Sequence, residues 1–243
     1  MRFLLVVVFT LFTGGAMASD LVEPTLHIAP GGKDHPQVAL TLDACDGATD
    51  DRILSVLVAN KIPATLFVTG KWLRHNAAAI KTLTTHPDLF ELEDHGANHI
   101  PAVLGKAKVY GITPAGTLAA VDSEVQVGAG DLMLAAGVQS HWYRDATARY
   151  SPTAIKEIGT LGYQVAGYSL NGDYGASVFA PVAARQISGA KDGDVIIAHI
   201  NQPKRHSGEG VAEGILALQA KGFKFVRLED VQTIANDDNP AGK

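Results

Sequence analysis

Cysteine is almost absent from this sequence, since Cys45 is the only one among 243 residues. A single cysteine cannot form an intrachain disulfide, so the fold must be stabilised by packing rather than by cross-links. Charge is also sparse: charged residues make up 19% of the chain, and the formal net charge is −5. Such a chain lacks the basic field that attracts nucleic acid or an anionic membrane surface. We therefore expect neither as a partner.

The sequence also lacks an apolar run long enough to span a membrane. Residues 1–18, MRFLLVVVFTLFTGGAMA, carry one charge and end in Ala16-Met17-Ala18. A spanning helix needs roughly 20 apolar residues, and glycines interrupt this shorter core. The pattern is typical of a secretory signal peptide cleaved after the small residues. No cysteine follows them to carry a lipid, so we expect a secreted or periplasmic protein without a membrane anchor.

Apolar segments with helical patterns between them make up most of the remaining chain. Hydrophobic residues account for 47% of the sequence, which is typical of a globular protein with a sizeable core. The alternation predicts an α/β protein in which crossover helices join parallel strands. The predicted strands are 37–43, 64–68, 194–199 and 223–228, and the predicted helices are 53–57, 76–84, 152–161 and 209–221.

A segment rich in glycine and alanine separates the two halves of this pattern. It covers residues 102–140 and has candidate helices at 114–126 and 130–136. We interpret it as an insertion over the functional site and not as a second domain. The predicted organisation is a signal peptide at 1–18, a lead-in at 19–35, one domain at 36–232 and a polar tail at 233–243.

Polar side chains that could carry chemistry follow the predicted strands. Functional groups gather at the carboxyl ends of parallel strands, because the loops there converge on one crevice. Each residue alone also has an ordinary explanation. Two histidines four residues apart are usually a surface or capping arrangement, and an aspartate at a strand end is commonly a helix N-cap. In chain order the candidates are Asp43, His95, His99, Arg144, Asp173 and His199.

In this order the segments resemble the motifs of the polysaccharide deacetylase family, also called carbohydrate esterase family four or the NodB-homology domain. VALTLDACDGATDDRIL and IPATLFVTGKWL resemble the family's T-F-D-D-G motif and the strand that follows it. ELEDHGANHIP resembles its H-S/T-x-x-H motif, YRDATARYSP its R-P-P-Y-G motif, SLNGDYGA its D-x-x-D-W motif and GDVIIAHI its L-x-H motif. The resemblance covers roughly residues 36–232. It implies a single domain with a distorted (β/α) barrel.

The resemblance implies a metal-dependent hydrolase that removes acetyl groups from an N- or O-acetylated polysaccharide. Peptidoglycan, a chitin-like oligomer and an exopolysaccharide are the candidate substrates, and the residues do not distinguish between them. His95 and His99 would hold a divalent metal, expected to be zinc, with cobalt and nickel as alternatives. A metal held by imidazoles and a carboxylate lowers the pKa of a water molecule and polarises the acetyl carbonyl.

The resemblance also implies roles for four further residues. Asp43 would be the general base that accepts a proton from water, and His199 would be the general acid that protonates the leaving amine or alkoxide. Arg144 would hold the Asp43 carboxylate by charge-assisted hydrogen bonds. Asp173 would orient His199 and favour its protonated form.

The chain departs from the family pattern at the carboxylate ligand of the metal. Ala44 stands where the family has its second aspartate. Asp46, two residues further on, is the replacement that we expect, and it joins the histidine pair in the predicted metal site. Asp43 itself, water and a Cys45 thiolate are the alternatives. We interpret Cys45 as a small buried apolar side chain.

Two more departures concern the motifs around the substrate. Asp145 and Ala146 stand where the family has two prolines, and Thr147 stands where a tyrosine lends its backbone N–H to the oxyanion. We expect the loss of the prolines to relax the geometry of that donor. Tyr174 replaces the tryptophan beside Asp173, which is a mild change.

Two other functions fit the same residues. The first is a catalytically silent carbohydrate-binding protein that kept the fold but lost the metal together with its carboxylate. The second is a metal-dependent amidase of a small molecule on the same scaffold, because a fold alone does not fix the substrate. Trp142 either lines the substrate groove or lies in the core. The residues do not indicate an oligomeric state.

Overall fold

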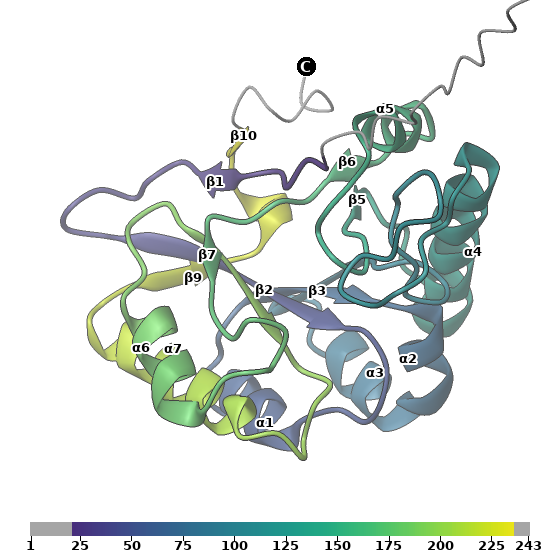
Figure 1. Cartoon of the computed structure of the whole chain (residues 1–243). Coiled ribbons are helices and arrows are strands. Elements are labelled where there is room, and N and C mark those ends of the chain that lie inside the picture. The colour runs from purple at the N-terminus through teal and green to yellow at the C-terminus, as the bar shows by residue number, and fades with distance from the viewer. Residues whose placement is uncertain (1–20, 236–243) are drawn as a thin grey trace, which may run out of the picture.

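The computed structural model describes residues 21–235, and its main sheet consists of parallel strands (Figure 1). The strand order is β6-β5-β4-β3-β2-β8-β7, and β9 pairs with the start of β2. The predicted signal peptide and the end of the predicted tail lie outside the described residues. The strands are β2 (Gln37–Ala44), β3 (Ala64–Val68), β4 (Phe90–Asp94), β5 (Trp142–Tyr143), β6 (Gln164–Val165), β7 (Leu170–Asn171), β8 (Val195–His199) and β9 (Lys224–Val226).

The strands at the two edges of the sheet, β6 and β7, follow each other in the chain, so the sheet must curl to bring its edges together. Residues 166–169 connect them. Backbone N–H groups continue the pairing on both sides of this connection, from Ala166 to the carbonyl of Tyr143 and from Ser169 to the carbonyl of Val195. The prediction of a distorted (β/α) barrel is therefore confirmed.

Helices cover the outer face of the sheet, where they pack against outward-facing side chains such as Leu40 and Leu42. In α1, the buried residues Ile53 and Leu57 are four positions apart, as expected for one face of an amphipathic helix. Asp50 caps its first turn. The helices are α1 (Asp51–Ala59), α2 (Gly70–His75), α3 (Ala77–Thr84), α4 (Leu118–Ala136), α5 (Pro152–Thr160), α6 (Ala180–Ser188) and α7 (Ser207–Ala220), and a 3₁₀ turn, η1 (Leu228–Asp230), follows β9.

A second apolar cluster fills the inside of the barrel. Successive side chains of a strand point to opposite faces, so Phe67 lies inside while its neighbours in β3 pack outward. Leu26 and Ile28 belong to this inner cluster. They come from β1 (Leu26–Ile28), which pairs antiparallel with β10 (Thr233–Ala235) in segments where the sequence predicted no strand. Trp142 also belongs to the cluster and is 7% exposed, so it is a core residue.

One helix stands where the sequence predicted two. The expected helices at 114–126 and 130–136 are a single helix, α4. Gly128 lies where α4 approaches the end of β4, since a Cβ atom there would be 2.4 Å from Oδ1 of Asp94. This glycine therefore permits close packing and does not break the helix.

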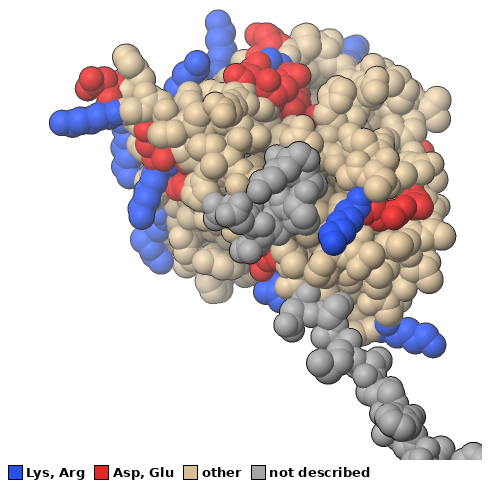
Figure 2. Space-filling model, turned by 90° about the horizontal axis from the view of Figure 1, so that it is seen from above, with Lys and Arg blue, Asp and Glu red and all other residues tan. Residues whose placement is uncertain are grey.

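The surface of the molecule carries dispersed charge. On the face shown in Figure 2, basic side chains lie mainly along one edge with acidic side chains beside them, and most of the remaining surface is uncharged. Within residues 21–235, no helix combines the length and hydrophobicity that a membrane crossing requires.

Candidate active site

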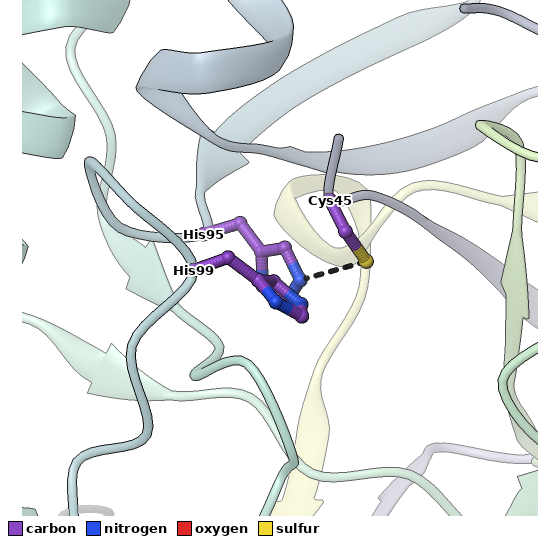
Figure 3. A group of neighbouring side chains, drawn as sticks. All are labelled: Cys45, His95 and His99. Atoms are coloured by element: carbon purple, nitrogen blue, oxygen red, sulfur yellow. Dashed lines mark hydrogen bonds between the residues drawn. The ribbon is translucent and has the colours of Figure 1, made fainter. Parts of the chain in front are cut away.

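Cys45, His95 and His99 lie together at the carboxyl ends of neighbouring strands. Cys45 directly follows β2 and His95 directly follows β4, and β3 pairs with both strands. One ligand atom from each of the three residues lies within 4.8 Å of the other two. Figure 3 shows Sγ of Cys45 turned toward the imidazoles, at 3.6 Å from Nε2 of His95.

A backbone carbonyl orients the ring of His95. Nδ1 donates to the carbonyl oxygen of Arg144 at 2.7 Å, so Nδ1 carries a hydrogen and Nε2 faces the cluster. Burial alone lowers the pKa of His95, but Asp43 and Cys45 together raise it to about 9. The ring is thus fixed with Nε2 toward the cluster, and a metal that binds there would displace the proton that this nitrogen carries at neutral pH.

Cys45 lies in surroundings that favour its thiolate. Burial alone raises its pKa, but hydrogen bonds with His199, His95 and His99 lower the pKa of Cys45 well below its usual range. The thiolate is the form of cysteine that binds metals. The structure therefore places Cys45 among candidate ligands, where the sequence analysis favoured a buried apolar side chain.

His99 lies in a loop that a buried glutamate stabilises. Its φ of 62° is in the left-handed region, which costs a non-glycine residue roughly 1–2 kcal/mol. Oε1 of Glu124, in α4, accepts hydrogen bonds from the backbone N–H groups of Asn98 at 2.7 Å and Ile100 at 3.1 Å. Glu124 was missed in the sequence, because its helical pattern does not distinguish it from a surface acid.

The donor atoms of this cluster fit a divalent metal. Nε2 of His99 is buried and has no hydrogen-bond partner among the described residues, although buried polar atoms are normally bonded. Two imidazole nitrogens and a thiolate sulfur are ligands typical of zinc, and catalytic zinc sites use three protein ligands.

The structure does not bring Asp46 to this cluster. The side chain of Asp46 is exposed, and its Oδ1 accepts a hydrogen bond from the N–H of Gly47 at 2.7 Å. The reason lies in β2, which stays extended and buried through Ala44. The turn that follows then directs Cys45 toward the histidines and Asp46 to the surface.

Asp43 and Arg144 form a buried ion pair beside the cluster. Nη1 of Arg144 donates to Oδ1 of Asp43 at 2.8 Å and to Oγ1 of Thr41 at 2.9 Å. Nη2 donates to the carbonyl of Gly167 at 3.0 Å, and the guanidinium lies 4.2 Å from the centre of the Phe67 ring. Both side chains are thus held in one geometry by several partners.

The second carboxylate oxygen of Asp43 faces the histidines. Oδ2 lies 3.8 Å from Nε2 of His95. Burial raises the pKa of Asp43, but Arg144, His95 and His199 outweigh it and hold the pKa below its ordinary value. Asp43 is therefore ionised at neutral pH and able to accept a proton.

His199 is paired with Asp173 across β8 and β7. Oδ1 of Asp173 accepts from Nδ1 of His199, and Oδ2 accepts from the backbone N–H of His199, both at 2.8 Å. Burial lowers the pKa of His199, but the Asp173 carboxylate raises it well above its usual value, with Cys45 contributing in the same sense. The structure thus brings together all four residues that were predicted to position or transfer protons.

Asp145 stabilises the turn after β5, where the family has a proline. Its carboxylate accepts from the N–H groups of Ala102 at 2.7 Å and Thr147 at 2.8 Å. Burial raises the pKa of Asp145 to about 6, although these N–H groups lower it. The turn is therefore fixed by hydrogen bonds, and the N–H of Thr147 is bonded within it instead of facing an oxyanion.

The cluster opens into a pocket of about 580 Å³, lined by Cys45, His99 and His199 among others. Two aromatic side chains also line it: Tyr174 is 51% exposed and Tyr110 is 70% exposed. Tyr110 belongs to the loop before α4, so only this first part of the predicted insertion borders the site. A pocket of this size is large enough for a small organic group or a sugar unit.

A family model described as polysaccharide deacetylase matches residues 31–166, and the chain belongs to this family. The predicted family and the predicted barrel type are both confirmed. A comparison with curated proteins gave no match.

Solved structures share this fold at low sequence identity. A peptidoglycan N-acetylglucosamine deacetylase is 21% identical, with a TM-score of 0.66 over 84% of this chain and 91% of that chain. A family 4 acetyl xylan esterase from Clostridium thermocellum, in complex with a cobalt ion, is 23% identical, with a TM-score of 0.63 over 80% and 89%. A family 4 pseudoenzyme from Bacillus anthracis is 17% identical, with a TM-score of 0.67 over 84% and 67%.

Proposed function

We propose that this protein is an exported deacetylase that hydrolyses acetyl groups of an acetylated polysaccharide and uses a divalent metal held by Cys45, His95 and His99. The observation that carries the proposal is the convergence of one sulfur and two nitrogen donors at the carboxyl ends of β2 and β4. In this assignment the Cys45 thiolate replaces the carboxylate that Ala44 lacks. Zinc is the metal that best matches these donors, ahead of cobalt and nickel.

The residues around the cluster supply proton transfer. A divalent metal bound there lowers the pKa of a water molecule and polarises the acetyl carbonyl. Asp43 accepts the proton of the attacking water at Oδ2, while Arg144 holds the other oxygen. His199, kept protonated by Asp173, donates a proton to the leaving amine or alkoxide.

The substrate and compartment follow from the family and the N-terminus. Relatives of the same fold include a peptidoglycan deacetylase and an acetyl xylan esterase, so we propose an N- or O-acetylated glycan of the cell wall or of an extracellular matrix. The signal peptide that we predict over residues 1–18 would deliver the protein to that glycan.

Substitution of Cys45 tests the ligand set. Cys45→Ala should abolish zinc retention and, with it, acetate release from an N-acetylglucosamine hexamer. Cys45→Asp restores a carboxylate and should retain both in part. Asp46→Ala is the matched control and should keep its zinc. Unchanged zinc in Cys45→Ala, with loss of zinc in Asp46→Ala, would assign the third ligand to Asp46 instead.

A second candidate uses Cys45 as a nucleophile. His199 and Asp173 form the histidine–carboxylate pair that activates cysteine in other hydrolases, and His199 contributes to the lowered pKa of Cys45. Acetate release would then survive chelation, Cys45→Asp would be inactive, and acid quenching would trap an acetyl thioester on Cys45. Purified protein that retains no zinc and releases no acetate would instead support a silent carbohydrate-binding protein.

A further inference from the structure

We propose that a second hollow beside the catalytic pocket binds an anionic sugar unit, so that the preferred substrate is an acetylated polysaccharide that carries carboxylates. The hollow has a volume of about 380 Å³ and is lined by residues 176–179 and 204–206. The inference rests on the proposed deacetylase function and deepens it by assigning a charge to the substrate.

The hollow adjoins the catalytic pocket. Arg205 lines both of them. One wall is also shared, because residues 174–175 line the catalytic pocket and residues 176–179 line the hollow. A glycan that presents one acetylated sugar to His199 therefore extends past Arg205 into the hollow.

The charged side chains that line the hollow are both cations. Lys204 and Arg205, which line the hollow, are exposed cations. Among the described residues that line the two spaces there is no aspartate or glutamate, although the chain has 25 acidic and 20 basic residues. A cationic path on an acidic protein concentrates anionic ligands.

Phe179 gives the hollow a flat apolar surface. Its side chain is 71% exposed, and its ring lies 5.9 Å from the ring of His206. An exposed aromatic ring next to cationic side chains offers a flat face on which an apolar face of a ligand can pack. The apolar face of a sugar ring can lie on Phe179 while its carboxylate meets Lys204 and Arg205.

The backbone of the loop that carries Lys204 and Arg205 is held in place by the side chain of Arg52. Arg52 donates through Nη2 to the carbonyl oxygens of Pro203 at 3.0 Å and Arg205 at 2.8 Å. The same guanidinium is fixed by two hydrogen bonds to the carboxylate of Asp50, from Nε at 2.8 Å and Nη2 at 2.6 Å. The backbone of this loop therefore loses less conformational freedom when a ligand binds, which favours affinity.

The shared wall is held in an unusual backbone conformation. Tyr174, Gly175 and Ala176 have φ values of 51°, 73° and 55°, all in the left-handed region. Nη1 of Arg205 donates to the carbonyl of Gly175 at 3.0 Å and so supports this segment. Left-handed non-glycine residues persist where the surroundings fix them, as at ligand sites. Because Arg205 also supports the wall, Lys204 and Phe179 are the residues to vary.

Binding can be measured separately from hydrolysis. The probes are a hexasaccharide of alternating N-acetylglucosamine and glucuronic acid and the neutral hexamer of N-acetylglucosamine. Calorimetry uses full-length His199→Ala, in which turnover is slow. It should show tighter binding of the anionic probe, and high salt should remove this preference. Lys204→Gln in this background should reduce the preference by about 2- to 5-fold. Phe179→Ala should weaken both probes by about 3- to 10-fold.

The control is Lys156→Gln, an exposed lysine on α5 outside both spaces, which should keep the preference. Equal affinity for the two probes would overturn the proposal, as would equal effects of Lys204→Gln and Lys156→Gln. Acetate release by the wild type is measured in parallel. Release from the neutral hexamer without charge preference supports the deacetylase and overturns the anionic subsite. Charge-selective binding without release from either probe supports the subsite and overturns the deacetylase.

Discussion

The two ends of the barrel both bury ionisable side chains, but they pair them differently. At the carboxyl end, His199 meets Asp173, whose carboxylate raises the pKa of His199 well above its usual value. At the amino end of β5, Glu91 and Glu93 of β4 are neighbouring carboxyl groups. Burial and this neighbour raise the pKa of Glu93 to about 9, and burial also raises the pKa of Glu91.

The hydrogen bonds at the two ends differ in the same way. Oε2 of Glu93 accepts from the backbone N–H groups of His141 at 2.8 Å and Trp142 at 2.9 Å, which links β4 to β5. Oε2 of Glu91 accepts from the hydroxyl of Thr65 at 2.6 Å. A protonated carboxyl bonded to the backbone joins strands, whereas an ionised group with an opposite charge beside an open pocket is suited to proton transfer. The comparison therefore indicates that the carboxyl groups of Glu91 and Glu93 join strands, whereas His199 and Asp173 are placed to transfer protons.

The largest effect should come from removing the acid at the carboxyl end. His199→Ala should lower kcat for acetate release by roughly 10²–10⁴-fold. Asp173→Asn should lower it by about 10- to 1000-fold. It should also move the alkaline limb of the pH profile downward, because Asp173 raises the pKa of His199. The acidic limb should stay in place. If His199→Ala keeps both limbs and most of the rate, this end does not transfer protons through His199.

Arg144→Met should have the next largest effect, because it leaves the Asp43 carboxylate buried without its cation. The free energy of unfolding should fall by about 3–5 kcal/mol at pH 7. Without the guanidinium, burial should raise the pKa of Asp43 above its unfolded value of 3.8, so the folded variant takes up a proton at a higher pH than the unfolded chain and gains stability as the pH falls. The deficit of the variant should therefore shrink toward pH 4. Urea unfolding of the wild type and of Arg144→Met at pH 7 and at pH 4 measures this difference in unfolding free energy. Arg149→Met, which removes an exposed ion pair with Glu23, is the control, and an equal loss there would contradict the assignment.

A smaller effect is expected from Glu124, which holds the loop of His99 next to the metal cluster. Glu124→Ala removes the acceptor that holds the loop of His99 and should weaken zinc affinity by about 10- to 100-fold. Glu124→Gln retains an amide oxygen for the same two N–H groups and should recover most of this loss. Zinc titration with a competing chelator measures both variants. Unchanged affinity in Glu124→Ala would show that the loop keeps its conformation without Glu124.

The smallest effect should come from the amino end. The folded pKa of Glu93, about 9, lies above its ordinary value of 4.5. The folded protein keeps a proton that the unfolded chain releases between these values, so stability falls as pH rises through this window. Glu93→Gln removes the titration and keeps an oxygen for the backbone N–H groups. The fall in unfolding free energy from pH 5 to 8 should be smaller in the variant. Parallel stability curves would mean that the carboxyl pair is not protonated.

Much of the fold was predictable because hydrophobic periodicity reports local structure. The strands at β2, β3 and β8 and the helices after them agree with the apolar runs. The two helices predicted within α4 were wrong, because Gly128 reads as a break unless its contact with the end of β4 is known. The strands β1 and β10 have three residues each. Segments this short carry no periodic signal and form only because they pair with each other.

The candidate site was predictable where a residue ends a strand and not where its environment comes from tertiary packing. Asp43 and His199 lie at strand ends that the pattern located. Cys45 had no partner at a recognisable spacing, and its thiolate character arises from histidines that lie far away in sequence. Asp46 was expected at the metal because it is close in sequence, but the direction of a side chain after a strand depends on where the strand ends.

The pairing of β1 with β10 has a consequence for how the chain folds. Leu26 and Ala235 are opposite each other in the ribbon, and nearly the whole described chain lies between them. Contacts this distant in sequence form slowly, because the entropy of closing the intervening loop must be overcome first. A circular permutant that links these two segments through a short loop and opens the chain elsewhere would turn this most distant contact into a local one, and it should fold faster.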